Sequence, residues 1–189
     1  HTRFSNPHGL PAENHYTTAR DLSYIARYAM KNPTFREIVA TQYYPPRNRK
    51  NKNKMLYHYD GGIGVKTGYT KEAGRCLVTA ATRNGMTLIC TVLNCPQMYE
   101  RSASLLDDAF DAYQMQYLLT AGTVLPVQSR DEKRSGVVKE DYYYPLSDGE
   151  NAQLEVRTRS ISSKNKEIVG QFTIYLSKRL LFSGNLYKL

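Results

Sequence analysis

The sequence predicts an α+β protein, in which an antiparallel sheet covered by helices is followed by a small all-β sandwich. Two apolar runs rich in β-branched residues flank Asn84-Gly85, which is the preferred centre of a tight hairpin turn. Helical periodicity appears on both sides of this hairpin. From residue 122 the pattern changes to short alternating strands, which we expect over residues 123–128, 137–144, 152–159 and 168–176. We therefore expect a first domain over residues 1–120 and a β-rich domain over 121–189.

Two helices are expected before the hairpin and one after it. Thr18 and Asp21 have the spacing of a capping box, and apolar residues then recur on one face until Asn32-Pro33 ends the helix. A shorter helix is expected over residues 34–40. Residues 98–119 place apolar side chains at helical spacing with acidic ones on the other side, so this helix should pack on the hairpin.

The hairpin itself comprises residues 76–82 and 87–93, and its two-residue turn pairs Thr82 with Thr87. Both runs are apolar on both faces, which is typical of strands inside a covered sheet. The preceding segment, which contains Lys66-Thr67-Gly68, then forms the first of three consecutive antiparallel strands.

This Lys-Thr-Gly segment combines three residue types that suit the C-terminal end of a peptide. Lys66 supplies an ammonium group, and the hydroxyl of Thr67 can hydrogen-bond a carboxylate. Gly68 lacks a side chain, so another chain can approach the strand and add to its edge. The tripeptide alone also fits a simpler interpretation, the glycine-rich end of a hairpin.

The flanking segments carry a family resemblance. Phe4-Ser5-Asn6-Pro7-His8-Gly9-Leu10, then His15 to Leu22, then Gly64 to Thr70 with Ala73-Gly74, resemble the low-molecular-mass penicillin-binding proteins, specifically the serine D-alanyl-D-alanine carboxypeptidases of bacterial cell walls. The resemblance runs in order to about residue 118, and the tail from about residue 122 resembles the β-rich domain that follows the peptidase in this family. It implies the C-terminal part of a penicillin-binding/β-lactamase-like peptidase domain with an appended β domain.

The resemblance also implies roles for individual residues. Lys66 would face the nucleophilic serine and supply positive charge and a link in the proton relay. Thr67 would bind the terminal carboxylate of the D-alanyl-D-alanine stem peptide, and Gly68 would let the substrate backbone lie along the strand. The backbone N–H of Tyr69 would form half of the oxyanion hole. Arg101 matches a family arginine that assists carboxylate binding, or else it is a solvent-facing helix residue.

Two other family motifs, Ser-x-x-Lys and Ser-x-Asn, should precede the Lys-Thr-Gly strand, but the sequence begins between the second and the third motif. Ser163-Lys164-Asn165-Lys166 and Ser183-Gly184-Asn185 fit these patterns in the wrong order, after Lys66. Residues 160–166 moreover have the composition of a turn rather than of a buried helix. We expect the C-terminal part of a longer protein, whose missing N-terminal half was removed or is a separate chain, and we expect this part alone to be inactive.

The expected function is that of a serine-type D-Ala-D-Ala carboxypeptidase that trims peptidoglycan stem peptides through an acyl-enzyme, inhibited by β-lactam antibiotics and requiring no cofactor. This chain would supply the substrate-binding strand and not the nucleophile. One alternative is a catalytically inactive module that binds wall peptides or partner proteins, and another is a β-lactamase-like acyl-serine hydrolase, which lacks the appended β domain. The resemblance places the protein outside the cytoplasm, with membrane attachment only through an anchor beyond this chain, since the apolar run 179–182 is too short to span a bilayer.

The net charge of +9 is concentrated in one segment. Five of the eight residues from Arg47 to Lys54 are basic and none is acidic, and Pro45-Pro46 precedes them. We interpret this run as a flexible, solvated connection, with attraction to anionic wall polymers or lipid headgroups as the alternative. It belongs to no recognisable nucleic-acid-binding module, so no nucleic-acid partner is expected. Tyr43-Tyr44 are expected as half-buried strand residues.

The histidines and cysteines indicate no metal or disulfide. His8 lies in a loop that borders the active site in the resembling family, where its ring either takes part in chemistry or holds the loop by backbone hydrogen bonds. The other three histidines show no ligand spacing, so no metal is expected. The hairpin register places Cys76 opposite Leu93 and only diagonal to Cys95, while Cys90 points to the other face, so we expect free, buried thiols.

Overall fold

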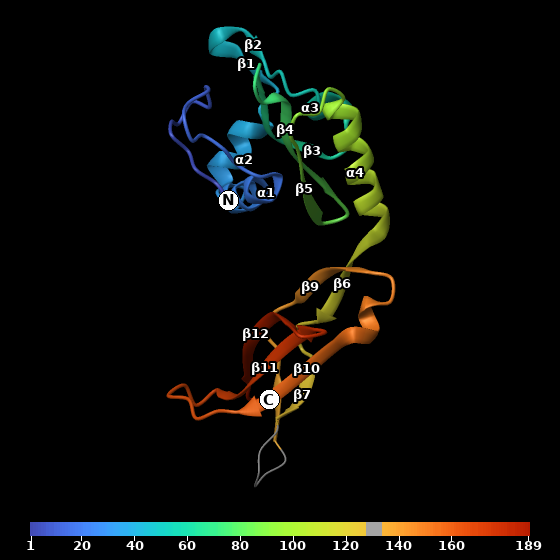
Figure 1. Cartoon of the computed structure of the whole chain (residues 1–189). Coiled ribbons are helices and arrows are strands. Elements are labelled where there is room, and N and C mark those ends of the chain that lie inside the picture. The colour runs from blue at the N-terminus through green and yellow to red at the C-terminus, as the bar shows by residue number, and fades with distance from the viewer. Residues whose placement is uncertain (128–133) are drawn as a thin grey trace. The chain divides into compact units, whose positions relative to one another are not determined.

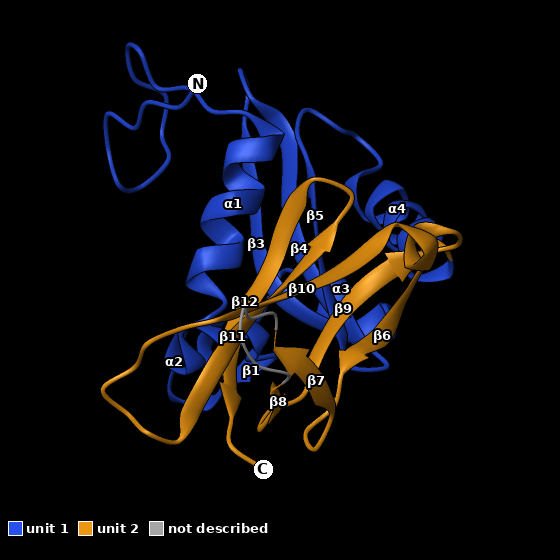
Figure 2. Cartoon of the chain, turned by 90° about the horizontal axis from the view of Figure 1, so that it is seen from below, with its two compact units in different colours: residues 1–111 blue, residues 112–189 orange. Residues whose placement is uncertain are grey.

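The computed structural model describes residues 1–127 and 134–189, which form two compact units, His1–Asp111 and Ala112–Leu189 (Figure 2). Gln128, the last residue of an expected strand, lies outside the described residues. Within the two described ranges, no helix has the length and apolar character needed to cross a membrane.

Unit 1 contains four α-helices and five strands in its described residues (Figure 1). In chain order these elements, with one 3-10 turn, are α1 (Ala19–Ala29), α2 (Pro33–Ala40), β1 (Tyr43–Tyr44), η1 (Pro45–Arg47), β2 (Arg49–Lys50), α3 (Met55–His58), β3 (Gly62–Thr70), β4 (Gly74–Arg83), β5 (Met86–Val92) and α4 (Met98–Ala112).

The predicted helix starts are confirmed. The Thr18 hydroxyl accepts a hydrogen bond from the backbone N–H of Asp21 (3.0 Å) and caps α1, as its spacing indicated. α1 ends at Ala29, three residues before Asn32, where the sequence predicts its end. Asn32 instead accepts, through its side-chain oxygen, from the N–H of Thr34 (2.9 Å) and of Phe35 (3.2 Å). It is therefore the N-cap of α2, with Pro33 at the first helical position, where a missing N–H costs nothing.

The three-stranded antiparallel sheet has the order β3-β4-β5. Thr82 pairs with Thr87, as predicted, and their hydroxyls lie 2.8 Å apart. Asn84 and Gly85 both have positive φ (49° and 78°), which a type I′ turn requires. The sequence signal at this turn therefore fixes the register of the sheet that carries β3.

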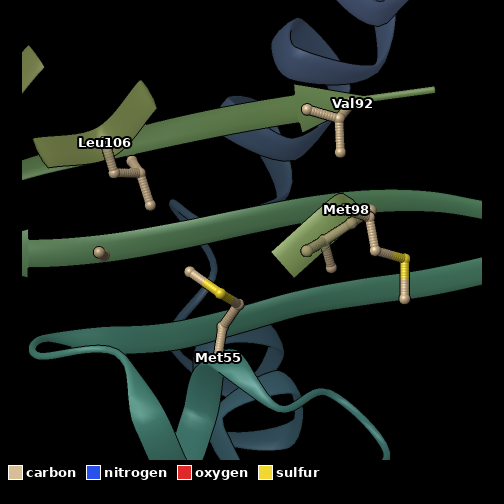
Figure 3. Packing of buried hydrophobic residues seen from close by; sticks show 6 residues of the cluster. Met55, Val92, Met98 and Leu106 are labelled. Carbon is tan, nitrogen blue, oxygen red and sulfur yellow. The ribbon is translucent and has the colours of Figure 1, made fainter. Parts of the chain in front are cut away.

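Helices cover both faces of this sheet. On one face, α3 and α4 contribute to a cluster of buried side chains, some of which are shown in Figure 3: Met55, Leu77, Ala81, Val92, Met98 and Leu106. On the other face, α1 lies against β5, where the Ser23 hydroxyl is 2.8 Å from that of Thr91. The packing of α4 on the hairpin was predicted and is confirmed.

In its described residues, unit 2 consists of two antiparallel sheets, with strand orders β10-β11-β12-β8-β7 and β6-β9. Side chains of both sheets share a core, in which Leu119 and Tyr142 meet Phe172 and Ile174. The unit is therefore a small β sandwich. Its elements are β6 (Tyr113–Leu119), β7 (Val124–Val127), β8 (Arg134–Val137), β9 (Tyr142–Ser147), η2 (Glu150–Gln153), β10 (Leu154–Ser160), β11 (Ile168–Leu176) and β12 (Arg179–Tyr187).

Two predicted element ranges are wrong. The helix expected over residues 98–119 ends at Ala112, because Tyr113–Leu119 forms β6 and pairs with β9. The strand expected over residues 137–144 is divided, since β8 ends at Val137 and β9 begins at Tyr142. In both cases pairing between segments distant in sequence overrides a local pattern.

Three further expectations are also corrected. The basic run is not a flexible connection but part of an ordered hairpin, in which Tyr43 pairs with Lys50 and Tyr44 with Arg49. Both tyrosines are exposed rather than half-buried. The three cysteines are free, as predicted, but they are half-buried rather than fully buried.

Candidate functional site

The predicted substrate-binding residues lie on β3, which is an edge strand. It pairs with β4 on one side, placing Lys66 opposite Val78 and Thr67 opposite Leu77. Among residues 1–127 and 134–189, no strand pairs with its other edge. The backbone groups along that edge are therefore available to an extended chain.

Lys66 and Thr67 point to opposite faces of the sheet, since side chains alternate along a strand. Thr67 shares a face with its partner Leu77, which is buried against α4. Lys66 shares the other face with Val78 and lies exposed, where its ammonium donates to the carbonyl oxygen of Thr67. The site thus offers a hydroxyl on the α4 side and a cation on the α1 side.

The first half of β3 is enclosed by neighbouring backbone and side chains. A Cβ added at Gly62 would collide with the carbonyl of Met55. Gly64 has φ of +143° and lies beside Val39 of α2, whose Cγ2 would be 2.8 Å from an added Cβ. The hydroxyl of Thr79 donates to the Gly64 carbonyl (2.9 Å) and fixes the strand there. These glycines are required by the packing.

Gly68, unlike Gly62 and Gly64, is not enclosed by neighbouring atoms. An added Cβ would meet only the Cβ of Cys76, at 3.7 Å, which is an ordinary van der Waals distance. Gly68 is exposed, and its φ does not lie in the left-handed region. Nothing in the part of the chain that the structure describes requires a glycine at this position, so the space beside it is available to a ligand.

The N-terminal segment borders a hollow beside the end of β3, with a volume of about 390 Å³. Its wall includes Phe4, His15 and Tyr16 from the N-terminal segment and Gly68, Tyr69 and Thr70 from β3. The two segments that carry the family resemblance therefore lie next to each other in space. His15 and Tyr16 were not predicted as site residues, and only their place in this resembling segment could have indicated them.

The loop of the N-terminal segment is held by side chains that bond its own backbone. Asn6 accepts from the N–H of Gly9 (2.8 Å) and donates to the Leu10 carbonyl (2.9 Å). The Nδ1 atom of His8 accepts from the N–H of Leu10 (3.2 Å), and His8 does not line the hollow. The structural interpretation of His8, a ring that holds the loop, is therefore confirmed.

Arg101 lies in the first turn of α4, on the same side of the sheet as Thr67. Its charge acts on Cys90, which pairs with Thr79 in β4 and so shares the α4 face of the sheet. Burial raises the pKa of the Cys90 thiol, and the nearby charge of Arg101 opposes that rise. The structure thus brings Arg101 and Thr67 to one face of the sheet, although no direct contact joins them.

A polar cluster at the start of β3 was not predicted from the sequence. The Tyr59 hydroxyl donates to Asp107 of α4 (2.7 Å), and the Arg83 guanidinium donates to the same carboxylate (2.9 Å). Arg83 also lies over the Tyr59 ring, 4.6 Å from its centroid, and forms an ion pair with Asp60 (3.4 Å). Burial, followed by the bond to Asp107, raises the pKa of Tyr59. The cluster ties the chain just before β3 to α4 and β4.

The two serine motifs found out of order lie in unit 2. The hydroxyl of Ser163 accepts from the N–H of Asn165 (3.1 Å) in the turn between β10 and β11, as predicted from its composition. Ser183 lies within β12. Neither serine opens a helix, so neither has the local structure that a Ser-x-x-Lys nucleophile needs.

Comparison with known proteins identifies the family. The family model described as D-alanyl-D-alanine carboxypeptidase matches residues 1–97, just over half of the chain. This chain therefore belongs to the D-alanyl-D-alanine carboxypeptidase family.

Curated relatives agree with this assignment. A D-alanyl-D-alanine carboxypeptidase of Streptomyces sp. (strain K15) is 44% identical over 104 residues, covering 49% of this chain and 36% of the relative. The carboxypeptidase DacF of Bacillus subtilis is 35% identical over 123 residues, covering 60% and 32%. The chain thus spans about a third of the length of these relatives.

Solved structures support the fold. A mutant of the Streptomyces K15 DD-transpeptidase is 39% identical, with a TM-score of 0.54, over 58% of this chain and 48% of that one. Penicillin binding protein 5 from Haemophilus influenzae aligns with 98% of this chain and 59% of its own, with a TM-score of 0.66 at 24% identity, which shows similarity of fold alone. Both units of this chain therefore have a counterpart in a penicillin-binding protein.

Proposed function

We propose that this chain supplies the substrate-binding strand of a serine-type D-Ala-D-Ala carboxypeptidase, which removes the terminal D-Ala of peptidoglycan stem peptides through an acyl-enzyme. Unit 1 is the C-terminal part of the peptidase domain, and unit 2 is an appended β-rich domain. The nucleophilic serine comes from the N-terminal half of the same protein, outside these 189 residues.

One observation carries this proposal most directly: Gly68 is exposed on an open strand edge and is not required by the packing around it. An extended substrate can therefore pair with β3 at this position without meeting a side chain. The match of residues 1–97 to the carboxypeptidase family supports a peptide that ends in D-Ala-D-Ala as the chain that pairs with this edge.

Each neighbouring residue has a role in this scheme. Thr67 donates its hydroxyl to the terminal carboxylate of the substrate, with the positive charge of Arg101 on the same face of the sheet. Lys66 supplies positive charge and a link in the proton relay on the opposite face. The backbone N–H of Tyr69 stabilises the oxyanion that forms when serine attacks the scissile carbonyl.

The same site takes β-lactam antibiotics, which acylate the nucleophile in place of the stem peptide. The substrate places the protein at the bacterial cell envelope, outside the cytoplasm. Contact with a membrane would be made by an anchor outside this chain, and the reaction requires neither a cofactor nor a nucleic acid.

Labelling with a fluorescent penicillin tests this proposal, applied to this chain and to the longer gene product that the proposal requires. The longer product should be acylated and this chain alone should not. Lys66→Ala in the longer product should slow acylation by about 100-fold or more, the size of effect expected when an electrostatic catalytic group is removed.

Lys71→Ala is the matched control, because Lys71 is exposed in the turn that follows β3 and has no role in the proposed chemistry. It should leave the acylation rate unchanged. A longer product that binds stem peptides but is never acylated would contradict the enzyme and favour an inactive wall-peptide module. Rapid turnover of penicillin without release of D-Ala from peptides would instead indicate that the protein is a β-lactamase-like hydrolase.

A further inference from the structure

The basic run of unit 1 accounts for more than half of the net charge of the chain. Between Glu37 and Asp60 there is no acidic residue, while five basic ones occur: Arg47, Arg49, Lys50, Lys52 and Lys54. The net charge of the whole chain is +9. The remaining 21 basic and 17 acidic residues give the other +4, spread over the rest of the chain.

These cations are carried by an ordered scaffold. β1 and β2 pair through Tyr43 with Lys50 and Tyr44 with Arg49, and the Tyr43 hydroxyl donates to Asn48 (2.9 Å) at the turn. At the base, the N–H of Asn51 donates to the carbonyl of Gln42 (2.7 Å).

Two further side chains tie the base of the hairpin to its surroundings. The side chain of Gln42 donates to the Leu56 carbonyl of α3 (2.7 Å), and that of Asn51 donates to the Thr41 carbonyl (3.0 Å). Figure 1 shows the hairpin projecting from one end of unit 1. Its charges are thus held together without using the basic side chains themselves.

The charges are not neutralised within the molecule. Arg47, Arg49, Lys50 and Lys52 are all exposed. In the part of the chain that the structure describes, none of these four side chains forms an ion pair or a hydrogen bond. Lys54 lies over the ring of Tyr99, with its ammonium 5.7 Å from the centroid. A cluster of unpaired cations is repulsive by itself, so an anionic partner relieves that repulsion.

A hollow of about 350 Å³ lies beside the hairpin, where two of these cations meet α2. It is lined by Ile38, Thr41, Tyr44, Arg49, Lys50 and Asn51. Arg49 and Lys50 thus flank a concave surface, and an anionic polymer bound by the hairpin could lie against it.

We propose that the β1–β2 hairpin is a binding surface for a flexible, soluble polyanion that carries phosphodiester groups. Repeated negative charge along such a polymer matches four unpaired cations that lie within six residues of one hairpin. A lipid surface is a poorer match, because the apolar residues between Gln42 and Lys54 are only Tyr43, Tyr44 and two prolines. Interfacial insertion normally uses Trp, Phe or Leu, which this hairpin lacks.

The consequence is a second attachment point, separate from the Lys66 chemistry. Binding of this kind depends on release of counterions, so its affinity falls steeply with salt. The hairpin would concentrate the protein where the polymer is, whatever reaction the β3 site performs. This inference is therefore independent of the proposed carboxypeptidase activity.

The test is binding of the full chain to a poly(glycerol phosphate) probe, followed by fluorescence anisotropy over a series of salt concentrations. The hairpin variant replaces Arg47, Arg49, Lys50 and Lys52 with Gln. We expect it to bind at least tenfold more weakly than the wild type. By analogy with single-stranded polyanions, the slope of log K against log salt should fall by about 3, or roughly 0.7 for each cation removed.

The matched control replaces four exposed lysines of unit 2 with Gln: Lys164, Lys166, Lys178 and Lys188. It removes the same charge and should keep most of the affinity. A charge-preserving variant, Arg47→Lys with Arg49→Lys, should also bind, which separates charge from folding of the hairpin. Equal losses in the hairpin and control variants would overturn the proposal, and so would binding to vesicles of phosphatidylglycerol and phosphatidylcholine but not to the polymer.

Discussion

The first half of β3, residues 62–65, is enclosed by α2 and α3, whereas the second half, residues 66–69, lies open. Added Cβ atoms collide with neighbours at Gly62 and Gly64, but at Gly68 the added atom meets only an ordinary contact. The same residue type therefore serves two purposes on one strand. Glycine in the first half of β3 permits close packing, and glycine in the second half leaves room for a ligand. Because the first half is held by its neighbours, it fixes the position of the open second half.

Gly64→Ala should lower stability more than the variants that follow. The substitution places a Cβ 2.8 Å from the Cγ2 of Val39 at a φ of +143°, which L residues rarely adopt. We expect a loss of about 2–4 kcal/mol in the free energy of unfolding, measured by urea denaturation. Gly9→Ala is a comparison for a positive φ without a steric collision, because Gly9 has a φ of +76° and no neighbour within 4 Å of an added Cβ. Equal losses in the two variants would show that packing against α2 does not matter.

Gly68→Ala should separate stability from binding. The free energy of unfolding should change by no more than about 1 kcal/mol, because the added methyl meets only the Cβ of Cys76 at 3.7 Å. In the longer gene product, acylation by penicillin should slow by roughly 10- to 100-fold, because the methyl group occupies the space for the substrate. An unchanged acylation rate would contradict the assignment of Gly68 as a substrate-contact position.

The smallest expected effect concerns the anchor before β3. Tyr59→Phe removes the hydrogen bond to Asp107 and should cost about 1 kcal/mol at neutral pH. The raised pKa of Tyr59 means that the unfolded chain releases this proton first, at about pH 10, so stability should fall as the pH rises above that value.

Urea denaturation between pH 8 and pH 11 measures this effect, and the variant should lose less stability over the alkaline part of that range than the wild type does. Tyr57→Phe is a comparison within α3, because the Tyr57 hydroxyl donates to the carbonyl of Gln42 and not to a carboxylate. If the wild type and Tyr59→Phe respond identically to alkali, the Tyr59 contact does not contribute to the anchor.

Much of unit 1 could be predicted because its signals are local. The caps at Thr18 and the turn at Asn84-Gly85 depend on residues within a few positions of one another, and both appear as expected. The end of α4 could not be found in this way, since Tyr113–Leu119 becomes a strand only by pairing with Tyr142–Ser147. Pairing between strands so far apart in the chain cannot be recognised from the residues of either strand alone.

The candidate site shows the same division. Lys66, Thr67 and Gly68 could be predicted as site residues because their residue types carry chemistry at adjacent positions. The hollow beside Gly68, by contrast, depends on His15 and Tyr16, which reach β3 only in the folded chain. The Tyr59–Asp107 contact likewise joins residues 48 positions apart.

The open edge of β3 also bears on self-association. An unpaired strand edge is a template on which a second copy of the same strand can add, the first step toward aggregation. Exposed Lys66 places a charge on this strand, and Gly62, Gly64 and Gly68 lower its tendency to form a regular ladder. The composition that leaves the edge accessible to a peptide thus also discourages copies of the protein from joining along it.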